Sequence, residues 1–203
     1  SSSASSTSTS TSAAASGSAA VTDEMVVPHP PGLYPRPLGR NVRLSTVREM
    51  KNKFTFLGRL LARALLDGRQ LDLPLSPVFF KWLLGEEASI RPAHLELVDP
   101  NLARQMRELW LLVERKRAIE KECLLSKLPQ EAKQAAIAEL GIEDLYLYFV
   151  LPGYKIELMK NGLETPVTAD NLERYLSLVT HWTLVEGVQR QMSALLEGFD
   201  SVM

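Results

Sequence analysis

The segment from Thr168 to Phe199 constrains the fold most, because its helical pattern carries apolar side chains on two faces. Thr168 or Asp170 is the expected N-cap of this long helix. One face comprises Leu172, Tyr175, Val179 and Trp182, and the other comprises Leu178, Val185, Val188, Met192, Leu195 and Phe199. A helix with two apolar faces needs two neighbours, and we expect the core to be one of them and a partner protein to be a candidate for the other.

An earlier helix is predicted to begin at Thr46, because Thr46 and Glu49 have the spacing of a capping box. Its large apolar residues fall around most of its circumference, so we expect a central helix that is nearly surrounded. These residues are Phe54, Phe56, Leu57, Leu60, Leu61, Leu65 and Leu66. Gly58 and Ala62 lie one turn apart and would let another element approach the backbone closely, and Gly68 is expected to end the helix.

A second long helix is predicted from Asp99, with Pro100 at its start. Apolar residues at helical spacing give it one stripe, formed by Leu102, Met106, Leu109 and Val113. Beyond Val113 charged residues take over, and the segment "PQEAKQAAIAEL" then returns toward Gly141. We therefore expect a projecting, charged helical hairpin, an insertion at about 111–141.

The remaining pattern predicts one short helix and two short strands. "PVFFKWLLG" reads as an apolar helix ended by Gly85. "DLYLYFVLPG" alternates, and "YKIELMKNGLETPVT" carries an Asn161-Gly162 turn signal between extended pieces. The expected fold class is therefore mainly α with small β-hairpins (α+β).

Residues 1–31 differ from the rest of the chain in composition. They begin with a Ser/Thr/Ala-rich run and continue into a Pro-rich stretch, and neither can bury enough apolar surface to offset the entropy of ordering. We expect a disordered linker there. The chain opens on Ser without a secretory signal and resembles an excised fragment.

Bulk composition excludes several classes of function. The formal net charge is −1, so no overall positive field recruits nucleic acid or an anionic membrane. No apolar run approaches the roughly 20 residues that span a bilayer, and a single Cys excludes an intramolecular disulfide framework. We expect a reducing compartment, the cytoplasm or the nucleus, and neither nucleic acid nor membrane as a partner.

The motifs of common active sites are missing from the sequence. It has no Gly-rich phosphate loop, no His-Glu-x-x-His, no Cys-x-x-Cys and no Gly-x-Ser-x-Gly, so no catalytic residue, metal site or cofactor is predicted. Cys123, the only thiol, follows Glu120 and Glu122 closely and has no histidine nearby in sequence, which favours an ordinary helix residue over a nucleophile. From the residues alone, the chain is a mainly helical binding domain.

Several blocks in series carry a family resemblance. They are "KFTFLGRLLARALLDGRQLDLPLSPVFFKWLLG", "DP" at a helix start, "YFVLPG", "NGLETPVTADNLERYL" and "EGVQRQMSALLEGFDSV". In this order and spacing, over roughly 32–202, the chain resembles the N-terminal lobe of a HECT-type ubiquitin ligase. "GLYPRP", "LPGYKIELMKNG" and the charged insertion are similar to the ubiquitin-fusion-degradation branch of that family.

The resemblance implies a relay of covalent steps. A ubiquitin-conjugating enzyme docks on the N-lobe, its ubiquitin thioester passes to a Cys in a separate C-lobe, and a substrate lysine then takes the ubiquitin. Residues 32–203 would be an incomplete N-lobe, with 98–182 as the part that binds the conjugating enzyme. The C-lobe and its catalytic Cys would be absent, so we do not expect this fragment of a ubiquitin transferase to be active alone, and Cys123 would be a bystander. Substrates would bind through regions outside this chain.

In the family, the conjugating enzyme docks in an apolar groove between the helix after "DP" and the helix after "VT". Carried over by position, the groove residues are Leu102, Met106, Leu109, Leu147, Tyr175 and Val179. Three alternatives stay open: the two apolar stripes simply pack on each other, the chain is a noncatalytic helical scaffold that recruits partners through the 103–140 hairpin, or Cys123 makes it a self-sufficient thiol enzyme.

Overall fold

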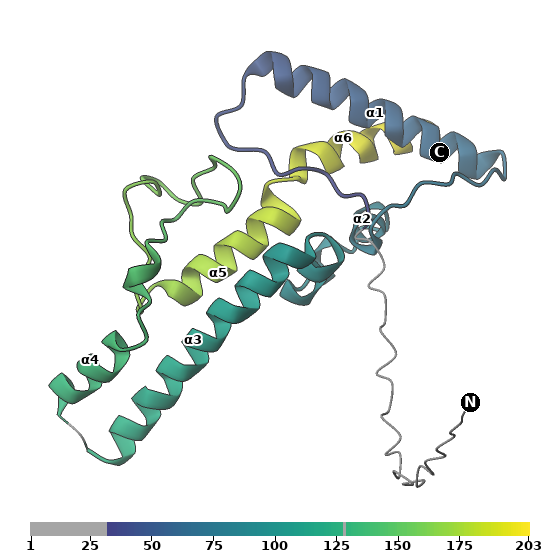
Figure 1. The fold of residues 1–203 in the computed structure, drawn as a ribbon. Coiled ribbons are helices and arrows are strands. Elements are labelled where there is room, and N and C mark those ends of the chain that lie inside the picture. Colours follow the sequence, from purple (N-terminus) through teal and green to yellow (C-terminus); the bar gives the residue numbers. More distant parts are fainter. Residues whose placement is uncertain (1–31, 128) are drawn as a thin grey trace, which may run out of the picture. The chain divides into compact units, whose positions relative to one another are not determined.

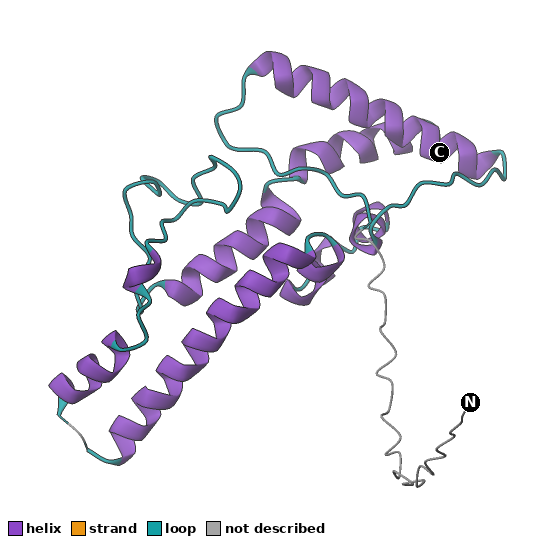
Figure 2. Cartoon of the chain, in the orientation of Figure 1, coloured by secondary structure: helices purple, strands orange, loops and turns teal. Residues whose placement is uncertain are grey.

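The computed structural model describes residues 32–127 and 129–203 (Figure 1), so the prediction of a linker at 1–31 lies outside the described residues. The described chain is mainly helical (Figure 2). The α-helices are α1 (Leu44–Leu66), α2 (Pro77–Leu83), α3 (Pro100–Leu125), α4 (Gln130–Ala138), α5 (Leu172–His181) and α6 (Gln189–Asp200). Short helices of other types are η1 (Glu87–Ser89), η2 (Pro92–Leu97), η3 (Glu143–Leu145) and the π-helical turn η4 (Trp182–Glu186). None of these described helices is long and apolar enough to cross a membrane.

Several helix ends fall where the sequence predicts them. The Asp99 carboxylate accepts a hydrogen bond from the Leu102 amide at 3.0 Å, which caps α3. Gly68 and Gly85 follow α1 and α2 in the left-handed region, at φ +62° and +68°, where glycine is favoured. α3 and α4 form the predicted hairpin (Figure 1), and Gly141 follows α4 with φ +62°.

Helix α1 differs from its prediction in two ways. It begins at Leu44, two residues before the predicted capping box, and Arg43 precedes it without a capping hydrogen bond from its side chain. α1 is also not surrounded. One face packs on α6 and a neighbouring apolar cluster, whereas Phe56 on the opposite side is 66% exposed and Leu65, near the end of the helix, is 62% exposed. A pattern of apolar residues cannot tell how many faces have a neighbour.

The predicted close approach to α1 is confirmed at Gly58. A β-carbon added there would overlap the carbonyl oxygen of Leu195 in α6, and one added at Gly198 would overlap the carbonyl oxygen of Thr55 in α1. The two helices therefore meet backbone to backbone, each through a glycine of its own.

Two apolar clusters divide the described core. The first joins α3, α5 and the loop between α4 and α5; its largest members include Phe149, Leu172, Tyr175 and Trp182. The second joins α1, α2 and α6 around Phe79, Trp82, Val188, Met192 and Leu195. The first apolar face predicted for 168–199 lies in the first cluster. Of the second predicted face, Val188, Met192 and Leu195 lie in the second cluster, whereas Leu178 packs against the first.

The break between α5 and α6 corrects the prediction of one long helix. At η4 the Gly187 amide donates to the Trp182 carbonyl at 2.8 Å, a bond that spans five residues and defines a π turn. The predicted caps of α5 are also wrong. Asn171 occupies the N-cap position, and its side-chain oxygen accepts from the Thr168 amide at 2.8 Å.

The extended segment 33–40 packs across the break between α5 and α6. Its hydrogen bonds reach residues of both apolar clusters. The Tyr34 hydroxyl donates to the Leu184 carbonyl at 2.6 Å and accepts from the Trp82 indole nitrogen at 2.9 Å. The Gln191 amide nitrogen donates to the Arg36 carbonyl at 2.7 Å. Because Leu184 belongs to the first cluster and Trp82 to the second, one phenol group bridges the two.

Burial of Tyr34 leads to a prediction about alkaline stability. Loss of hydration raises the pKa of Tyr34 from its usual 10.0 to about 12, against the hydrogen bond from Trp82, which lowers it. A raised pKa means that the folded state prefers the neutral phenol, so this contribution to stability is complete below pH 10 and is lost as the pH rises toward 12. We expect Tyr34→Phe to flatten the fall in urea midpoint between about pH 10 and about pH 12.

Tyr146→Phe, at a side chain that is 79% exposed, is the matched control and should leave the pH dependence unchanged. A Tyr34→Phe chain that keeps the full alkaline slope of the wild type would contradict the prediction.

The prediction of two short strands and small β-hairpins is corrected. Between 144 and 168 the structure has only isolated bridges, which pair Tyr148 with Pro166 and Val150 with Glu157. Pro166 has no amide hydrogen to continue a ladder. The turn signal itself is confirmed, because Asn161 adopts φ +58° and the Gly162 amide donates to the Met159 carbonyl at 3.1 Å.

Candidate functional site

An apolar groove of about 560 Å³ runs between η2, α3 and α5. Its walls are lined by Pro92, Ala93, Leu95 and Glu96 from η2, by Ala103, Met106, Arg107 and Trp110 from α3, and by Glu173, Leu176, Ser177 and Thr180 from α5. Leu95, Met106 and Leu176 are nearly buried, whereas Trp110 keeps about a third of its surface exposed. An open concavity with an apolar lining and a few polar groups is the usual form of a binding site.

Charged pairs stand at the rim of this groove. The Arg107 guanidinium lies 3.4 Å from the Glu96 carboxylate, and the Arg117 guanidinium lies 2.7 Å from the Glu173 carboxylate. Arg117 also stands over the Trp110 ring at 5.7 Å from its centroid. The Trp110 indole is therefore held between the groove and a cation that is itself paired with α5.

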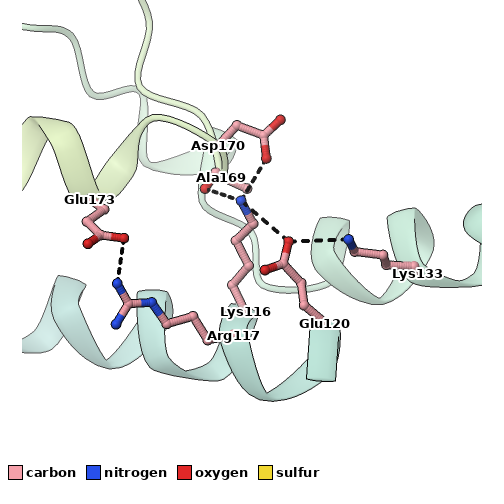
Figure 3. Close-up of polar contacts among 7 residues, drawn as sticks. All are labelled: Lys116, Arg117, Glu120, Lys133, Ala169, Asp170 and Glu173. Atoms are coloured by element: carbon pink, nitrogen blue, oxygen red, sulfur yellow. Dashed lines mark hydrogen bonds and ion pairs between the residues drawn. The ribbon is translucent and has the colours of Figure 1, made fainter. Parts of the chain in front are cut away.

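A second set of polar contacts ties α3 to the start of α5 and to α4 (Figure 3). The Lys116 ammonium donates to the Ala169 carbonyl at 3.0 Å and to the Asp170 carboxylate at 2.7 Å. The hydrogen bond from Lys116 holds the pKa of Asp170 below its usual 3.8. Glu120 lies 3.9 Å from Lys116 and 3.4 Å from Lys133 of α4, so the hairpin joins the same network.

Beneath the hairpin lies a more polar cavity of about 290 Å³, lined by residues that include Glu120, Lys133, Asp144 and Asp170. Within the ranges that the structure describes, no group of His, Cys, Asp and Glu side chains has the arrangement of a metal site. Cys123 lies on α3 near the hairpin tip and is buried.

Comparison with known proteins decides the family. The model of the HECT domain, described as a ubiquitin-transferase, matches residues 12–203. The chain belongs to the HECT family. The E3 ubiquitin-protein ligase TRIP12 of Danio rerio is 43% identical over 177 residues, and UPL4 of Arabidopsis thaliana, also named as an E3 ubiquitin-protein ligase, is 40% identical over 180 residues.

The predicted likeness to ubiquitin fusion degradation proteins is also confirmed. Ubiquitin fusion degradation protein 4 of Saccharomyces cerevisiae is 29% identical over 181 residues. Each of these three matches covers 84% of this chain and between 9% and 11% of the relative. The HECT chain described here thus spans about a tenth of the length of the relatives that it matches.

The structure brings the six groove residues predicted from the HECT resemblance into one apolar cluster. Leu102, Met106, Tyr175 and Val179 are buried, and Leu109 and Leu147 are partly buried against them. Met106 alone among the six also lines the groove. The predicted stripes therefore lie largely beneath the concavity of the HECT chain, where they hold its walls together.

Most residues that line the groove were missed by the sequence prediction. Ala103, Leu176 and Thr180 each directly follow a predicted residue, so they lie one helical position round from the buried stripe. The available signal was the row of small side chains beside each stripe, notably Ala103, Ser177 and Thr180. Small residues next to a fully apolar stripe leave room that larger residues would fill.

Tyr175 occupies the centre of the packing under the groove. It is 2% exposed, and its ring meets that of Phe149 edge to face at 5.7 Å between centroids. Burial raises the pKa of Tyr175 to about 12. The Tyr175 phenol is therefore neutral at physiological pH, and its side chain contributes by packing in the core.

Proposed function

We propose that this chain binds a ubiquitin-conjugating enzyme, the carrier, in the groove between η2, α3 and α5. The bound carrier would present its ubiquitin thioester to a Cys in a C-lobe outside these residues, and a substrate lysine would then receive the ubiquitin. The observation that carries the proposal is the apolar concavity between α3 and α5 in a chain of the HECT family.

The size and lining of the groove suit a small, reversible contact. A volume of about 560 Å³ takes one or two apolar side chains of a partner, with Trp110 standing over them at the rim. An interface of this kind buries less than about 1,200 Å² and binds weakly. Weak binding serves a relay, because the discharged carrier must leave before the next one arrives.

The proposed chemistry requires only that this chain hold the carrier in position. The acceptor thiolate attacks the carbonyl carbon of the thioester, a new carbon–sulfur bond forms, the old one breaks, and the carrier leaves as a thiolate. The neutral substrate amine later attacks the same carbon, forms an amide bond and releases the acceptor sulfur as a thiolate, and the proton lost by the amine passes to that sulfur or to water. Holding the donor near the acceptor raises its effective concentration without any acid or base here. Cys123 is a poor acceptor, because it is buried and lies about 20 Å along α3 from Trp110.

The test is to fill the groove without disturbing the core. Ser177 is exposed and lines the groove, so we expect Ser177→Arg to place a long charged side chain inside it and weaken carrier binding at least about tenfold, or 1.4 kcal/mol. Binding can be measured by titrating a panel of ubiquitin-conjugating enzymes into isotope-labelled chain and following the amides of Ala103 and Ser177 and the Trp110 indole.

His181→Arg is the matched control, because His181 is exposed one turn further along α5 and does not line the groove. It should bind carrier like the wild type. A panel of carriers that leaves all three groove signals unmoved in the wild type would rule out the proposed function.

The scaffold alternative has one feature in its favour. Leu124 and Leu125 are 80% and 75% exposed near the tip of the hairpin. If carriers bind there instead, the double change Leu124→Ser with Leu125→Ser will abolish binding in the same titration and Ser177→Arg will not. The groove proposal expects the reverse.

A further inference from the structure

We propose that Lys116 is a positioning residue that fixes the separation of α3 and α5, so that the charged α3–α4 hairpin controls the width of the apolar groove. The effect on carrier binding rests on the proposed function above. The effect on the distance between the two helices does not.

The hydrogen bonds of Lys116, which we call its ties, run from α3, one wall of the groove, to the start of α5, the other wall. Lys116 lies on α3 less than two turns beyond Trp110, and its ammonium contacts Ala169 and Asp170, which come just before α5. A backbone carbonyl and a carboxylate accept from the same ammonium, at 3.0 and 2.7 Å (Figure 3). The hydrogen bond from Lys116 to the Ala169 carbonyl matters most, because it restrains the backbone before α5 directly, whereas the Asp170 carboxylate belongs to a mobile side chain.

Burial distinguishes Lys116 from the other cations of this surface. Its side chain is 14% exposed, whereas that of Arg117, which pairs with Glu173, is 53% exposed. Exposed ion pairs contribute little stabilising free energy, because water and salt screen them. Charge-assisted hydrogen bonds from an ammonium group shielded from water contribute more. Lys116 is thus the main tie and Arg117 an auxiliary one.

The α3–α4 hairpin is connected to Lys116 through Glu120. Its carboxylate lies between Lys116 on α3 and Lys133 on α4, at 3.9 and 3.4 Å (Figure 3). α4 is therefore connected through Glu120 to the same ammonium that grips the start of α5. A movement of α4 shifts the charge balance around Lys116.

The start of α5 is linked in turn to the groove wall. Glu173 is one turn after Asp170 and belongs to the groove lining, and Leu176 and Ser177 follow it on the same face. If the tie at Lys116 is lost, this end of α5 moves relative to Trp110 on α3. The groove then loses its fixed width at the end where the Trp110 rim stands.

The experiment measures the helix separation and carrier affinity on the same variants of the full chain. Lys116→Met keeps the aliphatic stem and removes the charge, Lys116→Arg restores a cation, and Lys121→Met removes an exposed charge elsewhere on α3 as the matched control. Spin labels at Glu108→Cys and Arg174→Cys, both exposed, report the distance between α3 and α5 in a Cys123→Ser background.

We expect Lys116→Met to broaden the label distance and shift its mean by on the order of 2 Å, the scale of helix shifts in switching proteins. Carrier affinity should fall about three- to tenfold, measured by the titration described above. Lys116→Arg and Lys121→Met should keep both values near those of the wild type. If Lys116→Met fails to fold, Asp170→Asn weakens the same tie at a side chain that is 92% exposed, and should change both readouts in the same direction by less.

An unchanged label distance in a folded Lys116→Met chain would overturn the proposal. So would a changed distance with unaltered carrier affinity, because the groove would then not depend on the tie. If the wild type binds no carrier at all, the proposed function fails, and the label distance alone decides the role of Lys116.

Discussion

Replacing Tyr175 with alanine is expected to lower the free energy of unfolding by about 4 kcal/mol, the usual cost of removing a large buried aromatic side chain. The side chain is 2% exposed and packs edge to face on Phe149, so the change leaves a cavity under α5 that its neighbours cannot fill. Urea denaturation followed by far-ultraviolet circular dichroism measures the loss. Carrier binding should disappear with it, because the groove wall is no longer fixed.

Tyr175→Phe is the matched control, since it keeps the ring and its contact with Phe149. It should stay within about 1 kcal/mol of the wild type, as volume-conserving core changes do. A stable Tyr175→Ala chain that has lost only carrier binding would contradict this expectation and return Tyr175 to the docking surface itself. Loss of binding at Tyr175 therefore cannot locate the site without a stability measurement beside it.

Gly58→Ala is expected to cost about 3 kcal/mol, although alanine is the better helix former, because the added methyl group has no room. It would overlap the carbonyl oxygen of Leu195, which is backbone and cannot rotate away. α1 and α6 must then separate, and the apolar cluster around Met192 loosens with them. The fall in urea midpoint at constant slope measures the effect.

Gly85→Ala provides the comparison. Gly85 also resists substitution, but only through its positive φ of +68°, since nothing lies within 4 Å of an added β-carbon. Its expected cost is about 1 kcal/mol. Equal losses at Gly58 and Gly85 would show that the backbone contact between α1 and α6 is looser than the structure indicates.

The elements that could be predicted from the sequence are those whose causes are local. A capping Asp99 beside Pro100 marks the start of α3, and Gly68 and Gly85 mark the ends of α1 and α2. These signals act over a turn of chain and need no knowledge of the fold. The family resemblance was equally secure, because several sequence blocks in a fixed order are specific where each one alone is not.

The errors share a different cause. The exposure of Phe56 depends on which elements lie beside α1, and the loss of the predicted hairpins depends on whether Tyr148 and its neighbours find a continuous partner strand. Neither is a property of the segment itself. An apolar pattern records that a side chain favours burial, but the rest of the fold decides whether burial is achieved.

The sequence pointed to the helix pair α3 and α5, and of the six residues that it singled out only Met106 lines the groove between them. Leu102 and Tyr175 were correctly assigned to facing stripes, yet they lie in the core beneath the groove. Part of the groove lining falls one position round each helix from these stripes, at small or partly polar residues such as Ala103 and Thr180. Hydrophobic patterns find what is buried, whereas a docking surface must stay open.

The π turn at 182–186 has a consequence for how the two apolar clusters are joined. One residue more or fewer in a helix rotates everything beyond it by about 100°. Deleting one residue from this turn would swing Met192 and Leu195 away from Phe79 and carry Gly198 off Thr55. The rotation of α6 relative to α5 about the helix axis thus depends on one extra residue in the π turn. The hydrophobic patterns of α5 and α6 themselves do not reveal that residue.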